Sequence, residues 1–334
     1  MKSKFCSAPA ILFTVLALLA LLAMLAQHAS PATEAVRLRN ALLWDNAQPA
    51  DFEWTPKDVP SSYAIDGAGQ HALFDHVATQ LDLPSASNDW DRALLIARHL
   101  LANDRKGGPA KDDLEGTYRK IMAGGGYCGD YTTTFIAIAR SAGMFVREWA
   151  FSFDGYGGHG HAFVEVFDRN TGSWRFLDVF NNFFVVNRGT GQPLSALAFR
   201  DHLRGAKLDI QIVKAAAGRF GFRDQAKLMS YYHDGADQWY LWWGNAVVQY
   251  DNSLATRVLG RVSRSAEQLG AIATGVYPRI RALKSESNLG MQQRMAALKW
   301  KLLALFAGAL GLITALILQL RQRWSMRRAG SSIL

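Results

Sequence analysis

Two stretches without a single charged residue stand near the ends of this 334-residue chain. They are Ala8–Ala26 and Leu302–Leu320, and each is 19 residues long. A helix needs about 20 apolar residues to cross the hydrocarbon core of a bilayer. Both stretches therefore predict membrane-spanning helices, and the long region between them is left to form a folded domain outside the bilayer.

Much of the net charge of +9 lies beside these apolar stretches. Residues 1–8 contain Lys2 and Lys4, residues 321–334 contain four arginines, and neither end has an acidic residue. Basic residues that flank a span usually face the cytoplasm and its anionic lipids. Membrane lipid is therefore an expected partner, and nucleic-acid binding is not expected.

The orientation of the two spans in the membrane is predicted from the first span. The charges on the two sides of each span are nearly balanced, so they do not decide it. The first stretch follows a short basic leader and lacks a clean cleavage site, which favours an uncleaved anchor over a removed signal peptide. We expect two spans in the bacterial inner membrane, with both termini in the cytoplasm and the main domain in the periplasm.

Composition divides the chain into seven segments. Five prolines punctuate the region after the first span, which predicts loops and short elements. The segments are a leader (1–7), a span (8–26), an N-terminal extension (27–88), a core (89–195), an extension that is aromatic-rich and then helical over Arg257–Ala282 (196–300), a span (302–320) and a basic tail (321–334).

The core region shows helical and strand patterns in succession. Apolar residues at helical spacing predict helices over Asp89–Asp104, Leu114–Met122 and Asp130–Ala142. Alternation predicts strands over Met144–Phe153, His161–Asp168 and Trp174–Phe180. Residues 169–173 join the last two strands as a hairpin. This order predicts an α+β fold in which a helix packs on an antiparallel sheet.

Cys128 is the one cysteine of the folded region, because Cys6 precedes the first span. It follows Gly124–Gly126 and stands where a helix begins. The unpaired N–H groups of a helix N-terminus stabilise a thiolate, which is the nucleophilic form of cysteine. Glycines allow a tight turn there, and its backbone N–H groups suit an oxyanion hole. The alternative is a small buried apolar residue.

A thiol nucleophile also needs a base and a group that orients the base. His161 opens one strand of the hairpin, and Asp178 lies on the other within two or three positions of facing it. The spacing permits a catalytic triad of Cys128, His161 and Asp178, without a metal or another cofactor. Three alternatives stay open: His159 as the base, Asn181 or Asn182 as the orienting residue, and a metal site of His159, His161 and Asp178.

Four segments, in this order, resemble the transglutaminase-like superfamily: Gly126–Tyr131 (GYCGDY), Ser141–Arg147 (SAGMFVR), His161–Val166 (HAFVEV) and Trp174–Asp178 (WRFLD). The resemblance implies a papain-like core with Cys128 as nucleophile, His161 as base and Asp178 as orienting acid. Phe163 stands where the family usually has tryptophan, and Val179 stands where a proline often follows the aspartate.

The resemblance implies an enzyme that acts on amide bonds through an acyl-thioester. A cysteine protease or other hydrolase and an acyltransferase differ only in the last step. The expected substrates are peptides, proteins or amide-bearing polymers of the cell envelope. The alternative is a non-catalytic transglutaminase-like module for binding or assembly of envelope polysaccharide or exported protein, using the Trp-rich segment Asp237–Tyr250.

Overall fold

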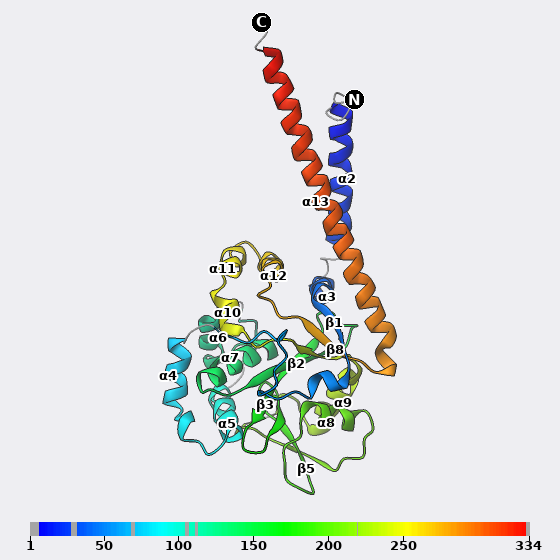
Figure 1. The fold of residues 1–334 in the computed structure, drawn as a ribbon. Coiled ribbons are helices and arrows are strands. Elements are labelled where there is room, and N and C mark those ends of the chain that lie inside the picture. Colours follow the sequence, from blue (N-terminus) through cyan, green and yellow to red (C-terminus); the bar gives the residue numbers. More distant parts are fainter. Residues whose placement is uncertain are drawn as a thin grey trace.

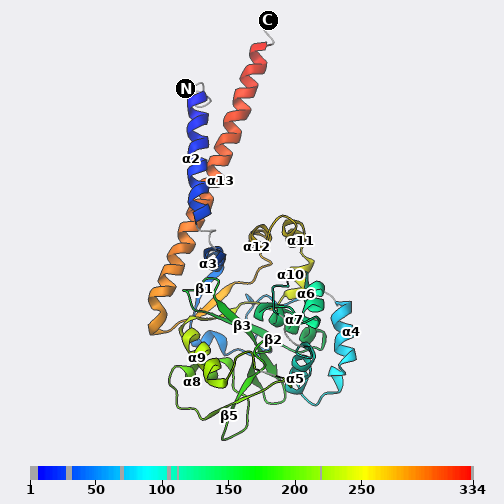
Figure 2. The ribbon, with the colours of Figure 1, turned by 180° about the vertical axis from the view of Figure 1, so that it is seen from behind.

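The computed structural model describes residues 7–27, 32–67, 71–103, 107–110, 113–218 and 220–331. An α+β domain lies at one end of the molecule. Two long helices, α2 (Ala8–Gln27) and α13 (Leu289–Ser331), rise from it side by side (Figures 1 and 2). Cys6 and parts of the predicted leader and tail lie outside the described residues.

Helices α2 and α13 are each long and apolar enough to cross a membrane. They run in opposite directions, so the start of α2 and the end of α13 both lie away from the domain (Figure 1). Where they touch, Gln319 Nε2 donates a hydrogen bond of 3.2 Å to Thr14 Oγ1, and both side chains are buried. Such a polar pair stabilises helix association in hydrocarbon, where water does not compete for the hydrogen bond.

Helix α13 extends well before the predicted span at 302–320. Its first turns belong to the domain, because Met295 and Leu302 are buried there. Lys299 Nζ donates a hydrogen bond of 2.5 Å to the carbonyl oxygen of Trp44. This contact connects the base of α13 directly to the edge strand of the main sheet.

The main sheet has six strands in the order β1-β8-β7-β2-β3-β4. Strands β1 and β8 pair in parallel, and the other neighbours are antiparallel. A separate two-stranded sheet joins β5 to β6. The strands are β1 (Trp44–Ala47), β2 (Val146–Ser152), β3 (Gly160–Asp168), β4 (Ser173–Leu177), β5 (Phe184–Asn187), β6 (Ile210–Val213), β7 (Trp239–Trp242) and β8 (Ile280–Leu283).

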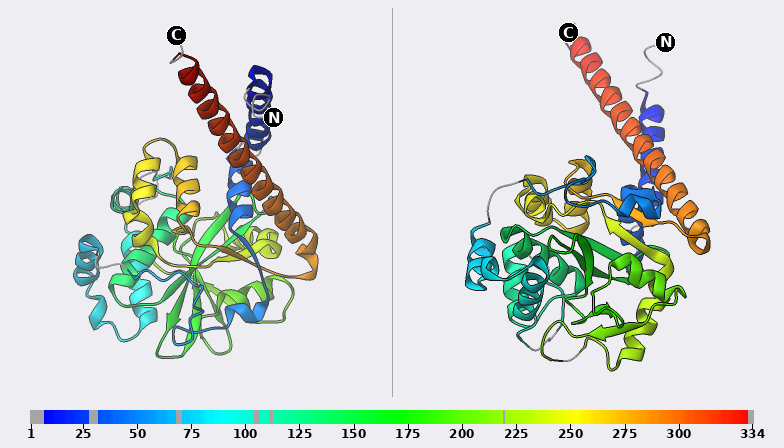
Figure 3. Two further views of the ribbon diagram at one scale, coloured as in Figure 1. Left: turned by 45° about the horizontal axis from the view of Figure 1, so that its top comes forward. Right: turned by 60° about the horizontal axis from the view of Figure 1, so that its bottom comes forward.

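Helices cover both faces of this sheet (Figure 3). Val146 and Val164 pack with helices α4 to α7 on one face, whereas Trp149 and Phe163 pack with α8 and α9 on the other. This follows from the alternation of side chains along a strand. The helices of the domain are α3 (Ala32–Leu43), α4 (Ala72–Gln80), α5 (Asp89–Leu100), α6 (Leu114–Met122), α7 (Cys128–Ser141), α8 (Ala196–Leu203), α9 (Gln225–Gly235), α10 (Val247–Asn252), α11 (Leu254–Gly260) and α12 (Arg264–Ala273). Short 3₁₀ turns are Pro49–Phe52, Leu83–Ser85, Ala236–Gln238 and Glu286–Asn288.

The predicted α+β class is confirmed, and helix α6 has the predicted bounds. The hairpin of β3 and β4 turns where the sequence predicted it. Strands β1, β7 and β8 come from the regions predicted as extensions, so the main sheet draws on all three regions between the spans.

The prediction of a continuous helix over Arg257–Ala282 is wrong. Helix α12 ends at Ala273, and the chain then enters strand β8. Gly275 adopts a φ of 73°, which side-chain-bearing residues rarely reach, and Pro278 cannot continue a helix. The apolar residues of β8 are instead buried between β1 and β7, which a local helical pattern did not indicate.

Candidate active site

Cys128 is the first residue of α7. Gly124 and Gly126 precede it with φ angles of 89° and 95°. A Cβ atom on Gly126 would lie only 3.1 Å from Ile121 Cγ1, so the turn requires a glycine. Asp130 Oδ2 accepts a hydrogen bond of 2.8 Å from the amide of Tyr127 and so caps the helix. The partly exposed thiol therefore stands at a defined helix N-terminus.

His161 lies at the start of β3, and Asp178 directly follows β4. Val164 pairs with Leu177, which places Asp178 two positions from facing His161. His161 Nε2 lies 2.7 Å from Asp178 Oδ2, and both side chains are buried. The hairpin register predicted from the sequence thus brings this imidazole and this carboxylate into a direct hydrogen bond.

Two further residues complete the surroundings of Asp178. Tyr232 of α9 donates a hydrogen bond of 2.6 Å to Asp178 Oδ2. Asn181 donates to Oδ2 from its side chain at 2.7 Å and to Oδ1 from its backbone at 2.9 Å. Burial alone would raise the pKa of Asp178, but the charge of His161 and these hydrogen bonds hold it below the ordinary value.

The alternative orienting residues have different positions. Asn181 Nδ2 lies 3.2 Å from His161 Nε2, so Asn181 and Asp178 approach the same ring nitrogen. Asn182 instead accepts a hydrogen bond of 2.7 Å from the amide of Ala216. Asn181 therefore belongs to the His161 group, while Asn182 holds a neighbouring loop.

The side chain of Cys128 also acts on the pKa of His161. Burial lowers the pKa of His161, but the charges of Asp178 and Cys128 and hydrogen bonds to both raise it to about 10. Because Nε2 faces Asp178, Nδ1 is the nitrogen left for the thiol. The raised pKa of His161 favours a protonated imidazole between Asp178 and Cys128. A protonated imidazole beside a cysteine promotes thiol reactivity.

His159 lies outside this group. Its side chain is exposed, and within the described residues its imidazole has no hydrogen-bond partner. The loop that holds it is nevertheless well anchored, since Thr33 of α3 donates a hydrogen bond of 2.5 Å to Asp154 Oδ2. The amide of Gly158 donates to Thr33 Oγ1 at 3.0 Å. The helix next to the first span thus fixes the loop that leads into His161.

The alternative metal site has no support in the described ranges, where no three His, Cys, Asp or Glu side chains are grouped to hold an ion.

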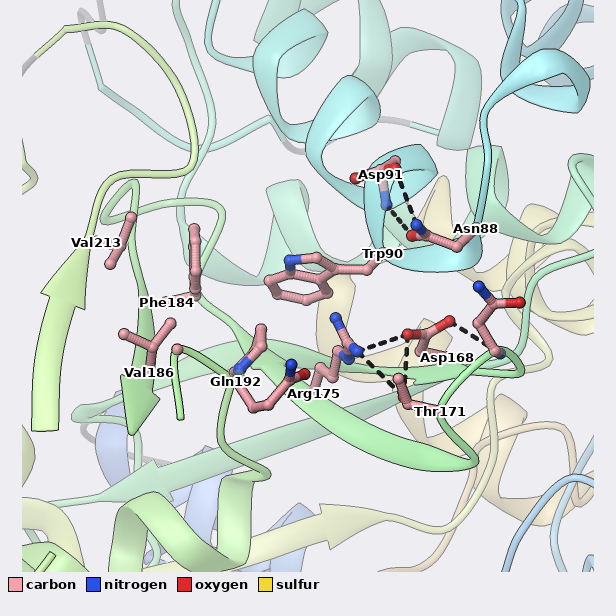
Figure 4. Close-up of a pocket in the computed structure, with 13 residues that line it drawn as sticks. Asn88, Trp90, Asp91, Asp168, Thr171, Arg175, Phe184, Val186, Gln192 and Val213 are labelled. Carbon is pink, nitrogen blue, oxygen red and sulfur yellow. Dashed lines mark hydrogen bonds and ion pairs between the residues drawn. The ribbon is translucent and has the colours of Figure 1, made fainter. Parts of the chain in front are cut away.

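A pocket of about 540 Å³ lies elsewhere, against the side of β4 (Figure 4). There Arg175 pairs with Asp168 at 2.7 Å and lies over the ring of Trp90. Neither Cys128 nor His161 lines this pocket.

Comparison with known proteins assigns the central part of the chain. Residues 75–179 match the model of the transglutaminase-like superfamily. This segment is a transglutaminase-like domain. The matched residues begin within α4 and include Cys128, His161 and Asp178. No curated protein and no solved structure matches the chain.

Two tyrosines of α9 contact the site from beyond the transglutaminase-like segment. Tyr232 donates to Asp178, and the ring of Tyr231 meets the ring of His161 edge-on with centroids 5.7 Å apart. Burial raises the pKa of Tyr231, and the charges of Cys128 and Asp178 raise it further. Neither tyrosine was predicted from the sequence, because a tyrosine pair in a helix has the same local pattern as ordinary core packing.

Proposed function

We propose that this chain is a membrane-tethered cysteine enzyme that acts on amide bonds. Cys128 would be the nucleophile, His161 the general acid and base, and Asp178 the orienting residue. The observation that carries the proposal is the position of His161, which hydrogen-bonds Asp178 through Nε2 and whose pKa is raised by both Asp178 and Cys128. A base held between a nucleophile and an orienting acid is the arrangement that thiol catalysis requires.

In the first step, the thiolate of Cys128 attacks the carbonyl carbon of the substrate amide. A C–S bond forms, and the carbonyl electron pair moves to the oxygen. The amide N–H groups in the first turn of α7 have no partner within the helix, so they are available to stabilise the oxyanion. The helix dipole acts in the same direction.

In the second step, the C–N bond breaks and the carbonyl re-forms as a thioester. The proton on His161 Nδ1 transfers to the departing nitrogen, which leaves as a neutral amine. Asp178, Asn181 and Tyr232 hold the ring in position during this transfer, and Asp178 stabilises its charged form. A well-positioned general acid or base contributes about 10²–10⁴-fold to rate.

In the last step, His161 removes a proton from water or from an acceptor amine, which attacks the thioester. The C–S bond then breaks and returns the thiolate. Water gives hydrolysis, and an amine gives a new amide. Both outcomes use the same residues, so the proposal covers a peptidase, an amidase and a transamidase.

The two apolar helices support a location of this chemistry at a membrane. With α2 and α13 as inner-membrane spans, the domain would face the periplasm. The substrates would then be peptides, proteins or amide-bearing polymers of the cell envelope. A non-catalytic binding module with the same fold is the outcome to be tested against.

The test is selective alkylation of the full-length protein in detergent at neutral pH, followed by peptide mass analysis. Cys128 should react rapidly with iodoacetamide, and His161→Ala should slow that reaction strongly. His159→Ala is the matched control, because this neighbouring histidine does not contact the group. Slow alkylation of Cys128 that is the same in all three proteins would contradict the enzyme proposal and favour the binding module.

The substrate would be sought in cells. A Cys128→Ala strain should accumulate uncleaved or unlinked envelope material, which can be identified by comparing peptide and polymer profiles with those of the parent. The same profile from a His159→Ala strain should match the parent. Identical profiles in the Cys128→Ala and parent strains would argue against turnover in the envelope.

A further inference from the structure

Helices α11 and α12 form a hairpin that carries most of the exposed large apolar side chains of the domain. Outside α2 and α13, the described residues include six such side chains, and four of them are on the hairpin. These four are Leu254, Val258, Val262 and Leu269. Leu254 is 72% exposed and Val262 is 76% exposed. Apolar side chains gathered in this way indicate an interaction surface.

The position of the hairpin indicates what it meets. It stands on the side of the domain from which α2 and α13 leave (Figures 1 and 2). The two views are related by a turn about the vertical axis, and in both the top of the hairpin is level with the domain-side end of α2. A bilayer crossed by α2 begins at the domain-side end of this helix. The surface of that bilayer therefore lies at the level of the top of the hairpin.

The charge of the hairpin suits an anionic surface. Arg257 and Arg261 are exposed beside the apolar side chains. No acidic residue occurs from Ser253 to Ala266. Arginine is well suited to bind phosphate groups, because its guanidinium presents several donors in a fixed plane.

The nearest carboxylates are turned toward the domain. Asp251 Oδ1 accepts a hydrogen bond of 2.9 Å from the amide of Leu114. Glu267 Oε1 accepts one of 2.7 Å from the hydroxyl group of Tyr250. The outer surface of the hairpin is therefore apolar and basic.

We infer that the α11–α12 hairpin is a third membrane contact. It inserts Leu254, Val258 and Val262 into the interfacial layer of an anionic bilayer, while Arg257 and Arg261 bind lipid phosphates. Apolar burial and attraction to anionic lipid act together in such surface contacts. The inference rests on α2 and α13 crossing that bilayer, as in the proposed function.

The contact would also determine how the active site meets the membrane. Cys128 packs in the same apolar cluster as Leu25, near the end of α2, and Leu302 of α13. The spans support the domain on one side, and the hairpin supports it on the other (Figure 3). Two supports hold the side that carries Cys128 at a constant distance from the lipid surface.

The experiment uses the full-length protein in nanodiscs, with Cys6 and Cys128 replaced by serine. A fluorophore is attached at one new cysteine, Val262→Cys at the hairpin tip or Leu16→Cys within α2. The control is Thr190→Cys, an exposed position in the turn after β5, at the opposite end of the domain (Figures 1 and 2). The nanodiscs contain brominated phosphatidylglycerol, an anionic lipid that quenches only fluorophores that touch the bilayer. Iodide is the second quencher, and it reaches only fluorophores that are exposed to water.

We expect brominated anionic lipid to quench the labels at positions 262 and 16 and to spare the label at position 190. Replacing phosphatidylglycerol with phosphatidylcholine, or introducing Arg257→Glu with Arg261→Glu, should reduce quenching at position 262 alone. Val258→Asp should have the same effect.

Each other outcome overturns a different statement. Without quenching at position 16, the spans themselves are not in the bilayer, and the tether fails. If brominated lipid quenches the label at position 16, but iodide quenches the label at position 262 as strongly as the control label at position 190, the hairpin inference fails. A label at position 262 that is shielded from both quenchers, in a protein that cross-links to a second copy, identifies a protein interface instead.

Discussion

The hydroxyl group of Tyr232 donates a hydrogen bond of 2.6 Å to Asp178, on the same oxygen that His161 contacts. A hydrogen bond to a charged group contributes about 1.5–3 kcal/mol. We expect Tyr232→Phe to lower kcat about 10-fold. Tyr232 is one of the groups that hold the pKa of Asp178 down, so the acid limb of the pH–activity profile should also move toward neutral pH.

Tyr118→Phe is the matched control for this substitution. Tyr118 hydrogen-bonds His99 at 3.0 Å on a distant helix pair, so its variant should keep the parent kcat and pH profile. An equal loss of kcat in both variants, without a pH shift, would mean that Tyr232 acts only on overall packing.

The two histidines near β3 should behave differently. His161→Ala should abolish turnover about as fully as Cys128→Ala, because members of one catalytic unit are not additive. Asp178→Ala should be severe but less complete, and His159→Ala should keep most activity. Steady-state rates of variants with unchanged melting temperatures measure this order. Loss of activity in His159→Ala together with retention in His161→Ala would reverse the assignment.

Protonation of His161 should make stability depend on pH. The pKa of this residue is raised from 6.5 to about 10 in the folded protein. The folded state therefore binds the proton more tightly than the unfolded state, and this stabilisation is complete below pH 6.5 and lost as pH rises to about 10. The melting-temperature difference between the parent and His161→Ala should be largest near pH 6 and should shrink toward pH 10.

Replacing Cys128 tests the cause of that dependence. Cys128 contributes to the raised pKa of His161. In a Cys128→Ala background, the melting-temperature difference caused by His161→Ala should therefore begin to shrink at a lower pH. Asp178 acts in the opposite range, because its lowered pKa makes its stabilisation disappear as pH falls below 3.8. A difference between parent and His161→Ala that stays constant from pH 6 to 10 would contradict the prediction.

Glu165 and Arg147 should matter for folding rather than for chemistry. Glu165 Oε2 accepts hydrogen bonds of 2.7 Å from Arg147 and from Trp149, and all three side chains are buried. Glu165→Ala leaves the guanidinium buried without its partner, which costs about 3–5 kcal/mol of unfolding free energy. Thermal melting should show this loss. The exposed pair Arg188–Asp209 is the control, since Asp209→Ala should change stability by at most about 1 kcal/mol.

The orientation of the spans can be measured in intact cells. A reporter that is active only in the cytoplasm should be active when fused after the last residue. Thr190→Cys should react with a maleimide that does not cross the inner membrane. The turn after β5 belongs to the domain, and the domain is expected to face the periplasm. An inactive reporter with an unreactive Thr190→Cys would place the domain in the cytoplasm.

Much of the fold was predictable where the signal is local. The start of α7 at Cys128 follows from glycines and helical spacing within a few residues, and the β3–β4 hairpin follows from alternation and a short turn. Strand β8 was not predictable in this way. Its pairing with β1 joins residues more than 200 positions apart, such as Trp44 and Ile280, and a distant partner leaves no periodicity in the strand itself.

The sequence by itself determined the two apolar helices, the helix that begins at Cys128, and the hairpin that carries His161 and Asp178. These depend on hydropathy, turn residues and alternation, which act between near neighbours. Only the tertiary structure decided that Tyr232 of α9 reaches Asp178 and that Thr33 of α3 holds the loop before His161. Those contacts depend on how separate elements pack against one sheet, because the free energy of burying their shared surfaces selects their positions.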